Sequence, residues 1–212
     1  MILFIALMGY LVYFTIVRAK TFVNSPYNQR QNAFAENVIR GDITDRNGNV
    51  LARTDVAEDG TETRVYPYSS IFSHVIGYSD QELGKTGLES VENFELLTSN
   101  AFFVERIQNE FNGNKDRGDT VVTTLDADLQ QAAYDALGDN KGAVVVMEAD
   151  TGKILAMVSK PDFDPNEISA NWETLNTDEQ NSPLLNRATG GSYAPGSVFK
   201  IVTTLAYMRQ YS

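Results

Sequence analysis

The chain has 212 residues, of which 42% are hydrophobic and 21% charged, so a disordered or collagen-like chain is excluded. Its formal net charge is −11 and neither half is basic, which argues against nucleic acid as a partner. Cysteine is absent and His74 is the only histidine, which excludes disulfides, cysteine-ligated metals, thiol catalysis and histidine-rich metal sites. We interpret His74 as a loop or core residue and expect neither a metal nor a cofactor.

The first 17 residues are almost entirely apolar and carry no charge. As a helix rising about 1.5 Å per residue they would span about 25 Å, close to the minimum for crossing a bilayer. We predict a transmembrane anchor over residues 1–20. A cleaved signal peptide is the alternative, because Val17-Arg18-Ala19 could be a cleavage site, although the basic start of such a signal is absent. By charge alone, Arg18 and Lys20 would favour a cytoplasmic location for the residues after the anchor.

The region after the anchor is predicted to contain a linker and a small folded unit. Residues 21–39 are polar, and we predict that they form the linker. Apolar residues on both sides of Asn47-Gly48 predict two short strands, because this dipeptide accepts the positive φ angles of a tight hairpin turn. Residues 88–111 have the apolar spacing of a helix. The polar residues 113–118 are expected to separate this unit from the next.

The second half begins with a predicted helix over residues 123–138, which carries acidic residues at its start and Gly138 at its end. Residues 142–159 predict a pair of strands, because two apolar runs flank a turn-forming tetrad. Residues 161–196 are rich in Pro, Asn, Gly and Ser, and predict a long irregular segment with a helical insert around Trp172.

A strongly apolar helix is predicted after Pro195-Gly196. Ser197 lies in its first turn and Lys200 three residues later, so the two side chains would share one face at about 5–6 Å. A serine nucleophile needs a base, and a lysine amine can serve if apolar neighbours keep it uncharged. The positive end of the helix would favour an oxyanion near Ser197. By itself Ser-x-x-Lys is a weak signal, since a helix-start serine and a solvated lysine give the same pattern.

Five ordered segments resemble a known family. Residues 186–200, NRATGGSYAPGSVFK, resemble the active-site start of penicillin-binding proteins, the serine D,D-transpeptidases that cross-link peptidoglycan. Residues 40–52 and 84–97 resemble that family's motifs before the catalytic domain, and residues 123–133 and 142–166 resemble the opening of its transpeptidase domain. An anchor followed directly by these motifs, with no glycosyltransferase region, is similar to the class B (monofunctional) branch and to its smaller members.

The resemblance implies an α+β fold in three parts. These are a transmembrane helix at residues 1–20, a linker and pedestal domain at 21–118, and the N-terminal portion of a transpeptidase domain at 119–212. It also implies a single-pass protein of the bacterial cytoplasmic membrane whose main domain is extracytoplasmic, which we prefer to the orientation that Arg18 and Lys20 suggest.

The resemblance also implies a reaction. Ser197 would attack the penultimate D-Ala carbonyl of a stem peptide, release the terminal D-Ala and pass the acyl group to an amine of a neighbouring stem peptide. Lys200 would be the general base, and the Ser197 backbone N–H would be one oxyanion donor. β-Lactams would acylate the same serine, and a SEDS-family glycan polymerase would be the membrane partner.

One departure from the family pattern concerns the rest of the site. The family completes it with Ser-x-Asn and Lys-Thr-Gly motifs downstream of the nucleophile, and residues 201–212 contain neither. Lys85-Thr86-Gly87 spells the second motif but lies upstream, so we reject it as catalytic. We therefore expect this chain to be an incomplete, inactive piece with an exposed apolar helix at 198–208. The alternatives are a β-lactam sensor or serine β-lactamase relative, which the pedestal-like motifs disfavour, and a non-catalytic membrane-anchored scaffold.

Overall fold

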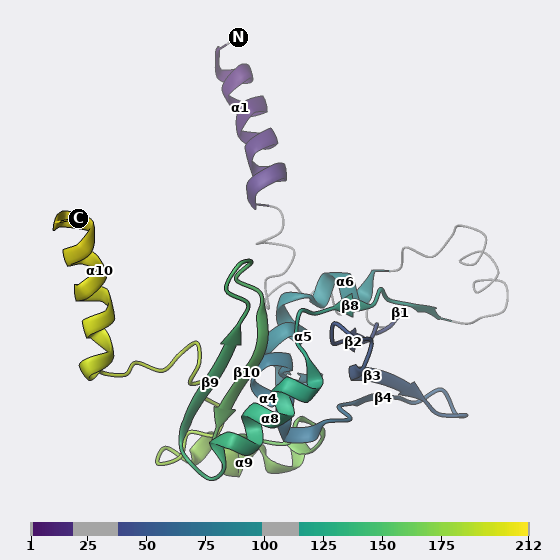
Figure 1. The fold of residues 1–212 in the computed structure, drawn as a ribbon. Coiled ribbons are helices and arrows are strands. Elements are labelled where there is room, and N and C mark those ends of the chain that lie inside the picture. Colours follow the sequence, from purple (N-terminus) through teal and green to yellow (C-terminus); the bar gives the residue numbers. More distant parts are fainter. Residues whose placement is uncertain (1, 19–37, 99–114, 212) are drawn as a thin grey trace.

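The computed structural model describes residues 2–18, 38–98 and 115–211 (Figure 1). Its helices are α1 (Ile2–Tyr13), α4 (Ser73–Ile76), α5 (Gly87–Val91), α6 (Asn93–Leu97), α8 (Ala127–Leu137), α9 (Ile168–Thr177) and α10 (Phe199–Tyr211), with shorter turns η1 (Phe14–Arg18), η2 (Ser69–Phe72), η3 (Pro165–Glu167) and η4 (Gly196–Val198). Its strands are β1 (Val38–Ile39), β2 (Ile43–Thr44), β3 (Val50–Val56), β4 (Glu62–Val65), β5 (Ser79–Asp80), β6 (Gly84–Lys85), β7 (Asp116–Arg117), β8 (Val121–Val122), β9 (Gly142–Met147) and β10 (Ile154–Lys160). The fold is thus mixed α and β, as predicted.

The N-terminal segment is helical, as α1 continuing into the π-helical turn η1, and its large apolar side chains are exposed. Figure 1 shows α1 projecting away from the rest of the structure. Among the described residues, no helix has both the length and the hydropathy needed to span a bilayer. The described residues therefore do not support the predicted transmembrane helix over residues 1–20.

The first folded unit is built on a four-stranded sheet in the order β4-β3-β2-β8. β2 and β3 pair antiparallel around Asn47-Gly48, where Gly48 has φ +89°, so the predicted hairpin is confirmed. β8 pairs parallel with β2 and comes from sequence beyond the predicted boundary at residue 118. Helices α5 and α6 confirm the helical spacing over part of 88–111, and residues 99–111 lie outside the described residues.

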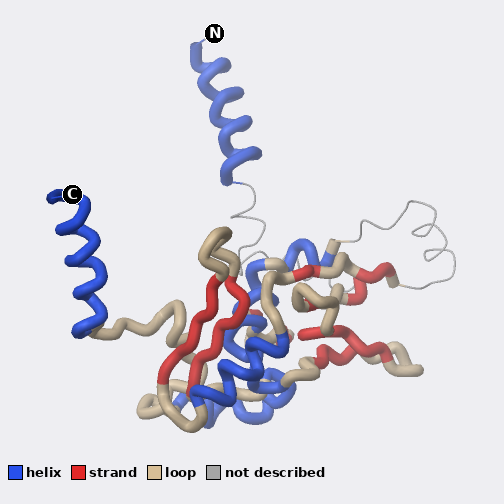
Figure 2. Tube along the Cα trace, viewed as in Figure 1, coloured by secondary structure: helices blue, strands red, loops and turns tan. Residues whose placement is uncertain are grey.

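The second unit packs α8 against the antiparallel β9–β10 hairpin, through buried Ala133, Ala156 and Val158. The predicted helix and strand pair are both confirmed here. The helix begins at Ala127 rather than 123, because Asp126 has extended backbone angles and caps it by accepting from Leu129 N–H at 3.1 Å. The predicted insert around Trp172 is α9. Figure 2 shows helices lying between this hairpin and the strands of the first unit.

The two units share one hydrophobic core, because Leu125 and Ala127 pack with Ile43, Leu51 and other residues of the first unit. Polar contacts cross the same boundary. The Asp45 carboxylate is fully buried and accepts hydrogen bonds from Asn47 N, Asn49 N and Asn49 Nδ2. It also accepts one from Ala127 N, at 3.1 Å, so the β2–β3 hairpin caps the first turn of α8.

A close backbone contact within the first unit requires a glycine at position 41. Gly41 N donates to Leu96 O at 2.8 Å, and the chain at Gly41 lies directly against residues 118–119. A Cβ at Gly41 would lie 2.0 Å from Asp119 O, which no side chain tolerates. Gly41 therefore permits a close approach of backbones between the segment before β2 and the segment before β8.

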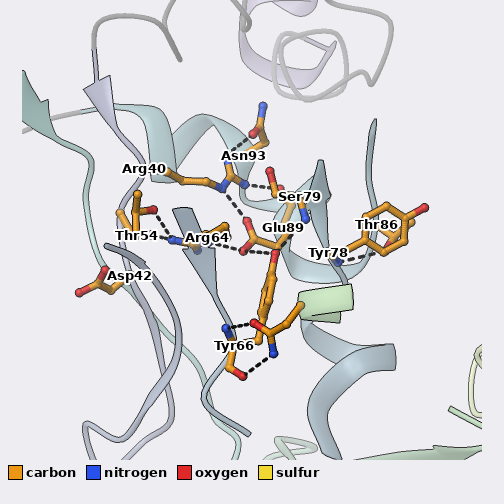
Figure 3. Close-up of polar contacts among 12 residues, drawn as sticks. Arg40, Asp42, Thr54, Arg64, Tyr66, Tyr78, Ser79, Thr86, Glu89 and Asn93 are labelled. Carbon is orange, nitrogen blue, oxygen red and sulfur yellow. Dashed lines mark hydrogen bonds and ion pairs between the residues drawn. The ribbon is translucent and has the colours of Figure 1, made fainter. Parts of the chain in front are cut away.

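The least expected feature is a buried carboxylate held by two guanidinium groups (Figure 3). Glu89 of α5 is fully buried, with Arg40 Nε at 2.6 Å and Arg64 Nε at 2.7 Å from its two oxygens. Tyr66 Oη donates to the same carboxylate at 3.2 Å. Burial raises the pKa of Glu89, but Arg40 and Arg64 outweigh this and bring the pKa below its ordinary value. This cluster joins the segments 40–52 and 84–97, which sequence analysis identified separately.

We predict that Glu89→Gln lowers the free energy of unfolding by about 3 kcal/mol, because it leaves two buried guanidinium groups without a counter-charge while keeping the side-chain volume. Urea unfolding at pH 7, followed by circular dichroism, measures this loss. Glu62→Gln is the matched control, since the Lys115–Glu62 pair at 2.6 Å is partly exposed and should contribute at most about 1 kcal/mol. Equal losses in the two variants would contradict this account.

Candidate active site

Ser197 and Lys200 lie in one helical run, Ser197 in η4 and Lys200 in the first turn of α10. The predicted turn before them is present, since Gly196 has φ +54° and Val198 N donates to Pro195 O at 3.2 Å. Both side chains are exposed, and no hydrogen bond joins them in the part of the chain that the structure describes. The structure therefore agrees with the predicted helix start and spacing.

The expected exposure of the apolar helix at 198–208 is confirmed. Every residue from Gly196 to Tyr211 is exposed, including large apolar side chains next to Lys200 such as Phe199 and Ile201, which are 51% and 63% exposed. Figure 1 shows α10 standing away from the β9–β10 hairpin. Among the described residues, no second element covers the apolar side chains next to Lys200.

The segment that leads to Ser197 is attached to strand β10. Ser159 Oγ donates to Leu185 O at 3.2 Å and accepts from Arg187 N at 2.9 Å. The Arg187 guanidinium folds back on its own segment and donates to the backbone oxygens of Asn181 and Ser182. The chain therefore reaches residue 187 in a defined position against the hairpin of the second unit.

Of the two interpretations of His74, a loop or a core residue, the structure supports the second, since His74 is buried in α4 at the boundary between the two units. Its Nε2 lies 3.1 Å from Pro161 O and its ring packs edge-on against Phe163 at 5.3 Å. Burial lowers the pKa of His74, and Arg187 lowers it further, while the Pro161 carbonyl and Asp162 oppose the shift. The imidazole is thus favoured in its neutral form and contacts the second unit rather than Ser197.

A cavity of about 230 Å³ lies beside His74 at this boundary. Its walls combine rings with neutral polar groups from both units, namely Ser73, His74, Tyr78, Thr86, Gly87, Phe163, Leu184, Asn186 and Thr189. None of these side chains carries a carboxylate. In residues 2–18, 38–98 and 115–211, no group of three or more acidic or histidine side chains could hold a metal ion.

Lys85-Thr86-Gly87, the upstream copy of a family motif, lies at β6 and the start of α5 in the first unit. Burial and the neighbouring Arg40 lower the pKa of Lys85, while Glu89 and Asp80 oppose this. Lys85 therefore belongs to the surroundings of the Arg40–Glu89 contact. This placement agrees with rejecting the motif as a catalytic strand.

Sequence reasoning missed two residues with long-range contacts, Glu89 and Asn186. Glu89 is one of several charged residues among apolar ones in the segment 84–97, and no local pattern marks it for burial. Asn186 stood inside the quoted motif 186–200 without an assigned role. Its amide bonds to a residue 112 positions earlier, and no local pattern in the sequence reports such a contact.

Comparison with known proteins identifies the family. Residues 142–210 match the penicillin binding protein transpeptidase domain, and residues 40–121 match the penicillin binding protein A dimerisation domain. The chain is 40% identical over 200 residues to the peptidoglycan D,D-transpeptidase PbpA of Mycolicibacterium smegmatis, covering 87% of this chain and 40% of that protein. It is 31% identical over 176 residues to the peptidoglycan D,D-transpeptidase MrdA of Escherichia coli K12, covering 66% of this chain and 28% of that protein.

Comparison with solved structures indicates the same family. Penicillin-binding protein A from M. tuberculosis, as an imipenem acyl-enzyme complex, matches with a TM-score of 0.74 and 36% identity, over 83% of this chain and 43% of that one. The D,D-transpeptidase domain of a peptidoglycan glycosyltransferase from Eggerthella lenta matches with a TM-score of 0.67 and 42% identity, over 79% of this chain and 36% of that one. Fold and motifs thus define a penicillin-binding transpeptidase architecture. The chain belongs to the class B penicillin-binding proteins and spans about 40% of the length of the PbpA relatives that it matches.

The buried His74 predicts a pH dependence of stability. Its native pKa lies below the ordinary value of 6.5, so the unfolded chain binds more protons as pH falls through 6.5, and stability is lost in that direction. Between pH 7.5 and pH 5.5, we expect wild type to lose up to about 1 kcal/mol more than His74→Gln, which cannot titrate. Urea unfolding at both pH values measures the difference. Parallel losses in both proteins would show that His74 titrates equally in the folded and unfolded chains.

Proposed function

We propose that this protein is a peptidoglycan D,D-transpeptidase that cross-links stem peptides through an acyl-enzyme on Ser197. The observation that carries the proposal is the position of Ser197 at the start of α10, inside the region that matches the transpeptidase domain. The name of the M. smegmatis relative and the imipenem acyl-enzyme of the M. tuberculosis relative support the same chemistry. The chain covers about 40% of the M. smegmatis relative, so the cross-linking activity of the whole protein is part of the proposal.

The reaction follows from the chemistry of a serine at a helix start. Ser197 Oγ attacks the carbonyl carbon of the penultimate D-Ala, and its proton passes to the Lys200 amine. The Ser197 N–H donates to the oxyanion of the tetrahedral intermediate. Collapse breaks the amide bond, and the proton leaves with the amine of the terminal D-Ala. An amine of a second stem peptide then attacks the ester, which forms the cross-link and restores the serine hydroxyl.

We also propose that the 212-residue chain is inactive by itself. Lys200 is exposed, and residues 201–212 contain no Ser-x-Asn or Lys-Thr-Gly motif. Loss of one oxyanion donor typically costs about 10²–10³ in rate, and loss of apolar cover would remove the base as well. β-Lactams would be covalent inhibitors of the complete site, because they present a strained amide to the same serine.

We also propose a membrane location and a domain organisation for the protein. Residues 1–20 would anchor the protein in the bacterial cytoplasmic membrane, with a linker and pedestal at 21–118 and the transpeptidase region at 119–212 outside it. The exposed apolar side chains of α1 support the anchor, because a bilayer would bury them. The substrate would be reached on the outer face of that membrane, where a SEDS-family glycan polymerase would be the partner.

The test is labelling with a fluorescent penicillin, applied to the protein as its gene encodes it. Ser197→Ala should abolish the label, because no other residue carries the attacking hydroxyl. Lys200→Ala should slow labelling by at least about 10², since a general base typically contributes that much. Lys85→Ala is the matched control and should label at nearly the wild-type rate.

Two outcomes would contradict the proposal. Persistent labelling of Ser197→Ala would place the nucleophile elsewhere in the chain. An inverse behaviour of the two lysine variants would assign the base to the upstream Lys-Thr-Gly copy. The 212-residue chain tested in parallel should label weakly or not at all, and rapid labelling would show that α10 needs no further cover.

A further inference from the structure

Asn186 connects the two folded units at the start of the segment that carries Ser197. Its Nδ2 donates to the backbone oxygen of His74 at 3.0 Å and lies 3.8 Å from Met157 Sδ. His74 belongs to α4 in the first unit and Met157 belongs to β10 in the second. One amide group therefore contacts both units, at a position 11 residues before the proposed nucleophile.

The same residue also organises the turn after it. Asn186 Oδ1 accepts from Ala188 N at 3.0 Å, which closes a turn of the kind that asparagine favours. The Asn186 backbone oxygen accepts from Gly190 N at 2.7 Å and from Thr189 N at 3.3 Å. The direction in which the chain leaves residue 190 is thus set by groups of Asn186.

This turn is the last attachment before Ser197. From Gly191 to Tyr211, no hydrogen bond reaches another element in the described part of the chain. The hydrogen bonds that fix where this segment begins must therefore involve residues 186–190 or residues before them. The turn is attached to the second unit through Arg187 and Ser159, and to the first unit through Asn186 and His74.

The acceptor of this contact is itself held firmly. His74 is bonded to Pro161 O and packed against Phe163, and Ile76 at the end of the same helix lies in the core of the first unit. Movement of α4 would therefore carry the Asn186 amide with it or break the hydrogen bond. The length of α4, four residues, leaves its carbonyls available to partners outside the helix.

We infer that Asn186 is a positioning residue whose side-chain amide fixes the start of the Ser197 segment to the pedestal helix α4. Its effect on catalysis rests on the proposed function, while its effect on the turn does not. The two effects can be measured separately, so that failure of one does not conceal the other.

The informative substitution is Asn186→Asp. Aspartate keeps the oxygen that accepts from Ala188 N but loses the Nδ2 donor, and it places a negative charge next to the His74 carbonyl. Asn166→Asp is the matched control. Asn166 also spans the two units, with Nδ2 donating to Tyr66 O at 3.0 Å and Oδ1 accepting from Tyr66 N at 2.9 Å, but it lies outside the segment leading to Ser197.

The first measurement is amide hydrogen exchange of Thr189 and Gly190 in the 212-residue chain, by NMR. We expect both amides to exchange at least tenfold faster in Asn186→Asp than in wild type, and at the wild-type rate in Asn166→Asp. Unchanged exchange in Asn186→Asp would overturn the inference, because the turn would then form without the contact to α4. This result does not depend on any enzymatic activity.

The second measurement is acylation by a fluorescent penicillin in the gene-encoded protein, compared with the melting temperature of each variant. We expect Asn186→Asp to lower the maximal acylation rate at least tenfold with little change in the half-saturating concentration. Asn166→Asp should lower the melting temperature at least as much, because the Asn166 amide also donates to Asp164 at 2.9 Å, and leave the rate unchanged. Equal slowing in both variants, or no slowing in Asn186→Asp, would reduce Asn186 to a purely structural role. Absence of wild-type labelling would refute the proposed function, and the exchange result would still decide the contact to α4.

Discussion

The Glu89 carboxylate is the interaction on which the arrangement of the first unit depends. Three charged side chains, from the segment before β2, from β4 and from α5, meet with almost no water around them. Removing charges from water costs several kcal/mol per ion, so the cluster is stable only because each carboxylate oxygen faces a guanidinium N–H, and Tyr66 Oη donates to one of them. The hydrogen bond from Arg64 Nη1 to Gly41 O extends the cluster to the backbone that enters the sheet. The two motif-bearing segments are thus held in one fixed relation.

From this cluster, a continuous series of buried contacts leads toward the proposed nucleophile. The β2–β3 hairpin presents Asp45 to the start of α8. Gln130 of α8 is fully buried and bonds to Ile71 of the first unit and to Met157 of β10. Residues of β10 and α4 then hold the turn that begins at Asn186. Each contact satisfies a polar group that would be costly to bury alone, which explains why the two units form one body rather than two independent domains.

The sequence predicted those features whose cause is local. The hairpin at Asn47-Gly48, the start of α8 near Asp126 and the β9–β10 pair follow from turn chemistry, capping and apolar runs over a few residues. The burial of Glu89 could not be predicted, because Arg40 and Arg64 lie 49 and 25 residues away in the chain, and the contact of Asp45 with Ala127 spans 82 residues. The contact between Asn186 and His74 is of the same kind. Ser197 and Lys200 were singled out by their spacing together with the family resemblance of residues 186–200, and the expected exposure of the apolar helix that follows them is confirmed.

The most direct test of this account is a peptide map of the gene-encoded protein after incubation with penicillin G. Trypsin cleaves after Arg187 and Lys200, so residues 188–200 form one peptide that contains Ser197. Mass spectrometry should find the intact drug mass added to this peptide, with fragment ions that place it on Ser197. An adduct on another peptide, or an unmodified protein after prolonged incubation with the drug, would contradict the assignment of Ser197 as the acylated nucleophile.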